Sequence, residues 1–206
     1  MRRLFKGVIP ARPIPARPWR RAQRGPPEPA NAVATGCSLK WYGQDPENWN
    51  VAVSGLVSNV LLVSPDEARE LLQRGYTYVD VRSEPEFALG RPPRACNVPW
   101  QRVEGDRLVD NSDFAIVMQS SFGATEPLII GCRSGSRSRA AVECLRRLGF
   151  THLAQLSHGF EGARDAFGRR LPGWRDSGLA IERGEPAAEL SYAGLQACRR
   201  RASSGG

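Results

Sequence analysis

A strand-like run that passes directly into a short loop and then into a helix is the feature that most constrains this chain. Residues 127–132 are mostly apolar, as in a buried strand, and the run ends at Cys132. Small residues and two arginines follow, and residues 136–148 carry apolar side chains at the spacing of one helix face. The amide groups of such a loop and the positive end of the helix would surround the Cys132 sulfur and stabilise its thiolate, the nucleophilic form. The pattern predicts sulfur or anion chemistry at Cys132.

The central part of the chain alternates between strand and helix patterns. Ser64, Pro65 and Glu67 have the spacing of a helix start, and Gly75 suits the end of that helix. Further helices are predicted at residues 113–122, 136–148 and 159–167, and strands at residues 76–81, 95–99, 127–132 and 152–156. Such alternation predicts an α/β fold in which a central parallel sheet is flanked by helices on both faces.

Three polar or reactive side chains fall where two of these strands end. Asp80 and Arg82 come at the end of the strand at residues 76–81, and Cys132 ends a later strand. Ligands of parallel sheets bind at the carboxyl ends of the strands, so these side chains are expected to converge. Asp80 and Arg82 have two interpretations, a purely structural ion pair or a supporting role in catalysis.

Basic residues are concentrated near the N-terminus. The 206-residue chain has a formal charge of +8, yet residues 1–27 contain eight basic residues and no acid. From residue 28 onward, 21 basic residues balance 21 acidic ones, so the excess charge does not belong to the folded part. A nucleic-acid partner is therefore not expected.

Composition and patterning divide the chain into four parts. Residues 1–36 are predicted to be a disordered basic tail or a transit peptide, and residues 37–59 a linker or docking segment. Residues 60–182 carry the periodic patterns of a folded domain, and residues 183–206 are predicted to be a C-terminal tail. The arginine-rich, acid-free N-terminus suits import into a mitochondrion or chloroplast. Its prolines and few serines suit, as an alternative, a plain disordered arm of a cytoplasmic protein.

The cysteine pattern argues against metal and disulfide sites. Five cysteines occur without a C-x-x-C pair, and only two histidines accompany them, so no metal and no other cofactor is expected. Cys96 and Cys144 fall at apolar positions of a strand and a helix, which favours packing roles, whereas Cys132 is expected in an exposed loop. No apolar run reaches the ~20 residues that span a bilayer. A monomer is expected.

Four segments, in order, resemble the single-domain rhodanese family of sulfurtransferases. They are Asp80-Val81-Arg82 with Glu86-Phe87 and Gly90, Cys96-Asn97-Val98-Pro99, the run from Cys132 to Ser138, and the run from Leu156 to Phe160. The resemblance covers residues 60–182, and the Cys132 loop is its most specific part. Arg91-Pro92, Arg94 and His158 depart from the family's pattern at positions that are mainly structural in the family. The fold is therefore expected to hold, with a pocket rim of altered shape.

The resemblance implies that Cys132 attacks the outer sulfur of a small anionic donor such as thiosulfate and becomes a persulfide. A thiol, or cyanide in vitro, then removes that sulfur. Arginines would orient the anion, and loop amides would stabilise the thiolate and the persulfide. Asp80 and Arg82 are expected to support the loop. Substrate binding is expected from the remaining loop residues, which are Arg133, Ser134, Gly135, Ser136, Arg137 and Ser138.

Two other functions are compatible with the same residues. Cysteine phosphatases and arsenate reductases also place a cysteine loop between a strand and a helix. Phosphatases, however, carry an arginine six positions after the cysteine, where this chain has Ser138. A rhodanese-like module that binds partners or senses oxidation without catalysis is the third hypothesis. Such modules commonly lose the nucleophile, so the retained Cys132 and its complete loop favour catalysis.

Overall fold

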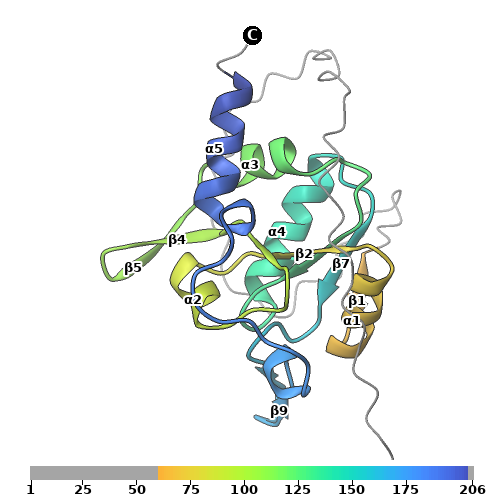
Figure 1. Cartoon of the computed structure of the whole chain (residues 1–206). Coiled ribbons are helices and arrows are strands. Elements are labelled where there is room, and N and C mark those ends of the chain that lie inside the picture. The colour runs from red at the N-terminus through yellow and green to blue at the C-terminus, as the bar shows by residue number, and fades with distance from the viewer. Residues whose placement is uncertain (1–59, 204–206) are drawn as a thin grey trace, which may run out of the picture. The chain divides into compact units, whose positions relative to one another are not determined.

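The computed structural model describes residues 60–203, with side chains described up to residue 198. A five-stranded parallel sheet runs through this part in the order β1-β7-β6-β2-β3 (Figure 1). The strands of the sheet are β1 (Leu61–Val63), β2 (Thr77–Asp80), β3 (Cys96–Asn97), β6 (Leu128–Gly131) and β7 (Leu153–Leu156). The helices are α1 (Pro65–Gln73), α2 (Glu84–Leu89), α3 (Phe114–Ser121), α4 (Ser136–Arg147) and α5 (Tyr192–Ser203). The predicted α/β fold with a central parallel sheet is confirmed.

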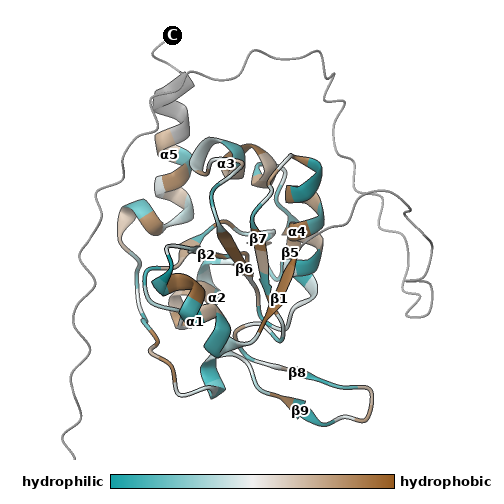
Figure 2. Cartoon of the chain, turned by 90° about the vertical axis from the view of Figure 1, so that its right-hand side faces the viewer, coloured by the Kyte–Doolittle hydropathy of each residue, from teal (hydrophilic) through white to brown (hydrophobic). Residues whose placement is uncertain are grey.

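Two apolar cores lie on opposite faces of the sheet. In β6, Leu128 and Ile130 belong to one core and Ile129 to the other, because successive side chains of a strand point to opposite faces. Helices α3, α4 and α5 pack on the first core, and α1 and α2 pack on the second. Figure 2 shows the apolar strands enclosed by helices that carry polar residues on their outer sides. Helices on both faces are therefore confirmed as well.

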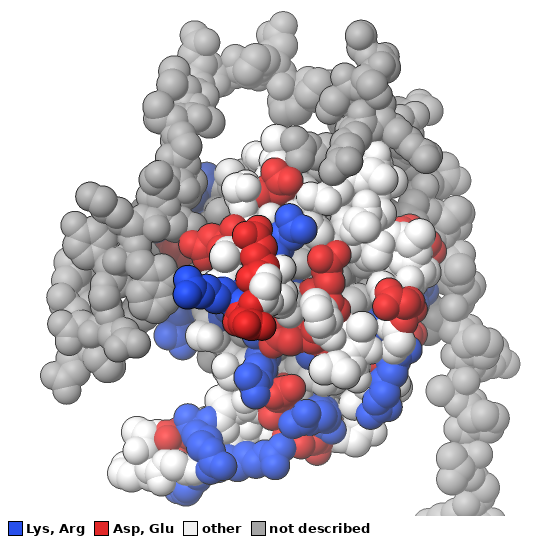
Figure 3. All heavy atoms as spheres, turned by 90° about the vertical axis from the view of Figure 1, so that its left-hand side faces the viewer, with Lys and Arg blue, Asp and Glu red and all other residues white. Residues whose placement is uncertain are grey.

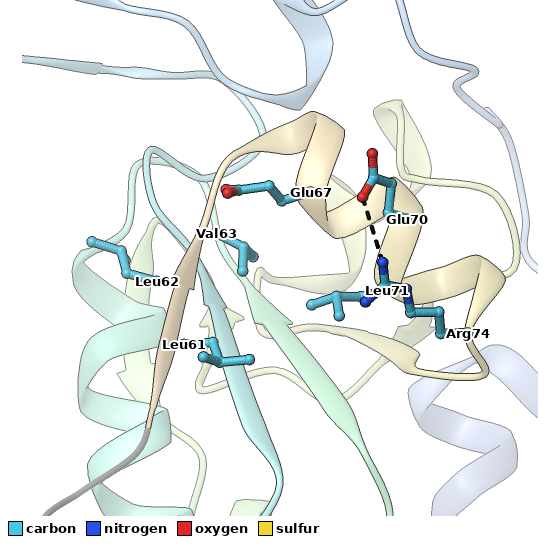
Figure 4. A pocket seen from close by; sticks show the side chains of 7 residues that line it. All are labelled: Leu61, Leu62, Val63, Glu67, Glu70, Leu71 and Arg74. Atoms are coloured by element: carbon cyan, nitrogen blue, oxygen red, sulfur yellow. Dashed lines mark ion pairs between the residues drawn. The ribbon is translucent and has the colours of Figure 1, made fainter.

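Local capping signals place the first helix as predicted. The backbone N of Ser64 donates to Glu67 Oε2 at 2.7 Å, and the backbone N of Glu67 donates to Ser64 Oγ at 3.4 Å. Gly75 follows the helix with a φ of +96°, a conformation that glycine adopts without strain. Together with β1, the helix forms a shallow open groove in which Leu71 points toward the strand (Figure 4).

The prediction of a helix at residues 159–167 is wrong. The segment leads instead into a hairpin of β8 (Ala163–Arg164) and β9 (Arg170–Leu171). Gly159 and Gly162 both have positive φ, which a right-handed helix does not contain. The carboxylate of Asp165 accepts the backbone N–H groups of Phe167 and Arg169, both at 2.9 Å, and closes the turn. These turn interactions set the conformation of the segment in place of a helix.

A second hairpin was not evident from the sequence. It consists of β4 (Gln101–Glu104) and β5 (Arg107–Asp110), which pair antiparallel within a charged stretch. Nearly all of its side chains are exposed, so the strands show no alternation between apolar and polar residues. The hairpin projects from the side of the domain that carries α2 (Figure 1).

Helix α5 lies in the part of the chain that was predicted to be a tail. Tyr192 and Leu195 are buried in the core that α3 and α4 also cover. The Tyr192 hydroxyl donates to Asn111 Oδ1 at 2.9 Å and accepts a hydrogen bond from Gln196 Nε2 at 2.9 Å. The sequence pattern of this helix is weak because, within residues 192–198, only Tyr192 and Leu195 are buried. The packed structure thus extends beyond residue 182, whereas the predictions for residues 1–59 lie outside the described residues.

Candidate active site

Cys132 lies between the end of β6 and the start of α4, at the carboxyl edge of the parallel sheet. Its Sγ accepts a hydrogen bond from the backbone N of Gly135 at 3.1 Å, and its thiol donates to Ser138 Oγ at 3.5 Å. The residue is fully buried, which corrects the expectation of an exposed loop position. An amide donor and the positive end of a helix together favour the thiolate form of a cysteine. The sulfur therefore has one backbone donor and one hydroxyl acceptor within hydrogen-bond distance, at the start of a helix.

Two glycines allow the segment after β7 to cover the Cys132 loop. Gly135 has a φ of +106°, and a Cβ there would lie 2.8 Å from the carbonyl oxygen of Ser157. Gly159 has a φ of +66°, and a Cβ there would lie 2.5 Å from the carbonyl oxygen of Cys132. The backbone N of Phe160 donates to that same oxygen at 2.7 Å. This close backbone contact fixes the loop and explains why the sulfur is buried.

Arg137 has a carboxylate partner in Glu86 of α2. Its Nη1 and Nη2 each donate to one oxygen of that carboxylate, both at 2.7 Å. The N and Oγ of Ser83 donate to the same carboxylate at 3.1 and 2.9 Å. Partial burial works to raise the pKa of Glu86, but the hydrogen bonds from Arg137 and Ser83 lower it to about 2. In the sequence, Glu86 stood out only as part of a motif, because 51 positions separate it from Arg137.

The other predicted binding residues differ in their surroundings. Arg133 is exposed, and its Nε donates to Glu161 Oε2 at 2.7 Å. Ser138 is buried, and its Oγ donates to the carbonyl oxygen of Gly135 at 3.0 Å. The two remaining loop residues are exposed: Ser134 and Ser136. The structure thus brings Gly135 and Ser138 to the sulfur and leaves the exposed side chains on the outside of the loop.

Asp80 and Arg82 form a buried ion pair. Arg82 Nη2 lies 2.6 Å from Asp80 Oδ2 and also donates to the carbonyl oxygen of Gly90 at 2.6 Å. The guanidinium carbon of Arg82 lies 4.2 Å from the centre of the Phe160 ring. Because Phe160 also binds the backbone of Cys132, the pair connects the end of β2 to the segment that covers the loop. This arrangement agrees with the structural interpretation of the pair.

Tyr78 of β2 lies against the backbone just before Cys132. A Cβ at Gly131 would collide with the Tyr78 hydroxyl, so glycine is required there. The hydroxyl has no hydrogen-bond partner among the described residues, and burial raises the pKa of Tyr78 well above its ordinary value. A buried donor without an acceptor destabilises a fold.

Tyr78→Phe is expected to leave the free energy of unfolding unchanged or to raise it by about 1 kcal/mol, because it removes an unpaired buried hydroxyl. The ring contact with Trp174, at 6.0 Å between centroids, is retained. The matched control is Tyr192→Phe, because the Tyr192 hydroxyl binds Asn111 and Gln196. This variant is expected to lower the free energy of unfolding by about 1 kcal/mol. Urea unfolding of both variants measures the difference. A loss from Tyr78→Phe as large as that of the control would contradict the expectation.

Cys96 has the packing role that its position in an apolar strand predicts. Cys96 is fully buried in β3, and burial raises the pKa of its thiol to about 12, which makes it unreactive. Within residues 60–203, no group of three or more His, Cys, Asp or Glu side chains is arranged to hold a metal ion. No helix in that range is long and apolar enough to cross a bilayer.

The sheet and the Cys132 loop lie within one stretch that matches a known protein family. A family model described as a Rhodanese-like domain matches residues 64–166. The chain belongs to the rhodanese-like domain family. The match ends inside the β8–β9 hairpin, so helix α5 lies beyond the part that defines the family.

Two plant proteins and one solved structure illustrate the similarity. The chain is 42% identical to Rhodanese-like domain-containing protein 15, chloroplastic, of Arabidopsis thaliana, over 45% of this chain and 51% of that protein. It is 37% identical to Thiosulfate sulfurtransferase 16, chloroplastic, of the same plant, over 48% of this chain and 82% of that protein. The crystal structure of Rv0390 from M. tuberculosis is 32% identical, with a TM-score of 0.50, over 60% of this chain and 99% of that chain. The chain spans about half the length of the first of these relatives.

Proposed function

We propose that this protein is a rhodanese-type sulfurtransferase that carries a sulfane sulfur on Cys132. The observation that supports this most is the Cys132 sulfur itself, which accepts the Gly135 amide at 3.1 Å at the start of α4. A backbone donor at this position can stabilise negative charge that develops on the sulfur during transfer. The 37% identity to a relative named thiosulfate sulfurtransferase supports the same class of reaction.

In the proposed reaction, the Cys132 thiolate attacks the outer sulfur of thiosulfate or a related donor. A new S–S bond forms, the S–S bond of thiosulfate breaks, and sulfite leaves with the bonding electrons. Cyanide or a thiolate then attacks the outer sulfur of the persulfide, and Cys132 leaves as a thiolate. The loop amides at the start of α4 stabilise the charge on the persulfide. Because Cys132 is fully buried, the donor has to be small.

The exposed loop side chains are proposed to bind the anionic donor. Arg133 is open to solvent beside the loop, and Ser134 and Ser136 offer hydroxyl groups. Arg137 is bound by Glu86, so an anion has to compete with that carboxylate for the guanidinium.

Glu86→Gln is expected to lower the KM for thiosulfate several-fold, because it removes the negative charge that competes with the donor for Arg137. Arg137→Ala is expected to raise the KM for thiosulfate, because it mainly weakens the use of anionic donors. Glu143→Gln is the control, since Glu143 pairs with arginines on the exposed side of α4. Steady-state kinetics with thiosulfate and cyanide measure the change. A KM that rises or stays the same in Glu86→Gln would count against competition at Arg137.

Mass spectrometry after incubation with thiosulfate tests the proposal directly. The expected result is a gain of one sulfur, about 32 Da, on the peptide that contains Cys132, because the persulfide is a covalent intermediate. Addition of cyanide should remove the mass and release thiocyanate. If no adduct forms on the folded protein, sulfur transfer through Cys132 is refuted.

One observation favours a second candidate, a rhodanese-like module that senses oxidation or carries persulfide without turnover. The sulfur is fully buried, and both loop arginines pair with carboxylates, Arg133 with Glu161 and Arg137 with Glu86, so a small anion has to displace a carboxylate to reach either guanidinium. The same pairing counts against phosphatase or arsenate reductase chemistry, which needs an arginine free for the oxyanion. A Cys132 that reacts with peroxide but not with thiosulfate would support the module.

We also propose import into an organelle. The basic, acid-free composition of residues 1–27 and the word chloroplastic in the names of two relatives support it. Fluorescence microscopy of the full chain fused to a fluorescent protein at its C-terminus, compared with a version lacking residues 1–36, tests this. Equal cytoplasmic distribution of both would refute import.

A further inference from the structure

A pocket separate from the Cys132 loop lies between α2, β3 and the chain that leads into α5. Its volume is about 410 Å³, and none of the loop residues 132–138 lines it. The residues on which the argument depends are Glu84, Phe87, Asn97, Glu185 and Tyr192. They come from three parts of the chain that only the fold brings together.

Asn97 presents a buried acceptor at this pocket. The side chain is 1% exposed, and its Nδ2 donates to the carbonyl oxygens of Asp80 and Arg82, both at 2.9 Å. Those two bonds fix the orientation of the amide. Its Oδ1 has no hydrogen-bond partner among the described residues. Such an atom requires an N–H or O–H donor, and a bound ligand can supply one.

Two carboxylates without a partner among the described residues line the pocket. Glu84 and Glu185 are exposed, and within residues 60–198 neither carboxylate has an ion pair or a side-chain hydrogen bond. Figure 3 shows acidic side chains gathered across the middle of the face that carries α2 and the β4–β5 hairpin, while basic ones gather below, toward β8 and β9. A ligand with a positive charge would therefore be attracted to this face.

Two aromatic side chains beside the pocket, Phe87 and Tyr192, already contact guanidinium groups. Both are almost fully buried, and the Tyr192 hydroxyl is engaged with Asn111 and Gln196. The Tyr192 ring has the guanidinium carbon of Arg102 at 5.6 Å from its centre, and the Phe87 ring has that of Arg91 at 4.9 Å. Both rings thus accept guanidinium groups at one side already.

We propose that this pocket binds an alkylguanidinium group. A guanidinium is planar and always charged, and its five N–H donors can serve an amide oxygen and a carboxylate at the same time. The alkyl stem would pack against the apolar side chains of the pocket. The group belongs either to a small molecule or to an arginine side chain of another polypeptide, and the chemistry of recognition is the same.

NMR titration of the full ¹⁵N-labelled chain with agmatine tests the pocket. The expected result is saturable shifts of the backbone amides of Glu84 and Ser191 and of the Asn97 side-chain amide. The uncharged analogue N-butylurea should bind at least tenfold more weakly. The double variant Glu84→Gln/Glu185→Gln should weaken agmatine binding at least tenfold, whereas Glu104→Gln, an exposed glutamate on β4 outside the pocket, should not change it.

A parallel titration with N-acetyl-arginine amide separates the two sources. Tighter binding of agmatine indicates a small molecule, and tighter binding of the amide indicates an arginine of a polypeptide. The proposal is overturned if agmatine produces no saturable shifts at the pocket, or if the double variant binds it as the parent does. Because binding is measured without sulfur transfer, this result is independent of the proposed activity at Cys132.

Discussion

Cys132→Ser is expected to abolish sulfur transfer, with a loss in kcat/KM of at least about 10³-fold. A serine hydroxyl is not ionised at neutral pH and forms no persulfide. The free energy of unfolding should change by less than about 1 kcal/mol, since a hydroxyl can accept the Gly135 amide and donate to Ser138 as the thiol does. The assay follows thiocyanate release from thiosulfate and cyanide, and urea unfolding follows stability.

The control for this prediction is Cys198→Ser. Cys198 is exposed on α5, so its replacement should leave both activity and stability unchanged. Substantial activity in Cys132→Ser would disprove the assignment of the nucleophile. Loss of activity in both variants would point to a general effect of cysteine replacement rather than to the chemistry of Cys132.

Gly159→Ala is expected to destabilise the protein by about 3 kcal/mol and to reduce sulfur transfer strongly. The positive φ of this residue costs an alanine about 1–2 kcal/mol, and a forced steric contact adds a similar amount. The contact is with the backbone of the active-site loop, because the new Cβ would lie 2.5 Å from the carbonyl oxygen of Cys132. Backbone atoms cannot move aside as a flexible side chain can, so the loop itself has to shift.

Gly178→Ala separates the effect of φ from the effect of the contact. Gly178 has a φ of +74°, close to that of Gly159, but no atom lies within 4 Å of a Cβ there. Gly178→Ala should lower the free energy of unfolding by about 1–2 kcal/mol and keep full sulfur-transfer activity. Equal losses of stability and activity in the two variants would show that the approach of Gly159 to the Cys132 loop is unimportant.

Segments with strong local signals were predictable. The capping box at Ser64 and the apolar run before Cys132 place α1 and β6, because capping and burial depend on neighbours a few positions apart. The position of Cys132 between a strand and a helix followed from the same patterns, and so did the parallel sheet. The turn signal of Asp165 and the nearby glycines was present too, but residues 159–167 were predicted as a helix in spite of it.

The sequence by itself determined α1, β6 and α4, the loop of Cys132 between a strand and a helix, and membership in the rhodanese-like domain family, since these depend on local patterns. Only the tertiary structure decided that Glu86 binds Arg137 across 51 positions, that Gly159 presses on the Cys132 backbone, and that α5 joins the core. Each of these depends on which distant segments the sheet order brings together. The burial of Cys132 is of the same kind, because the residues that cover it come from the segment after β7.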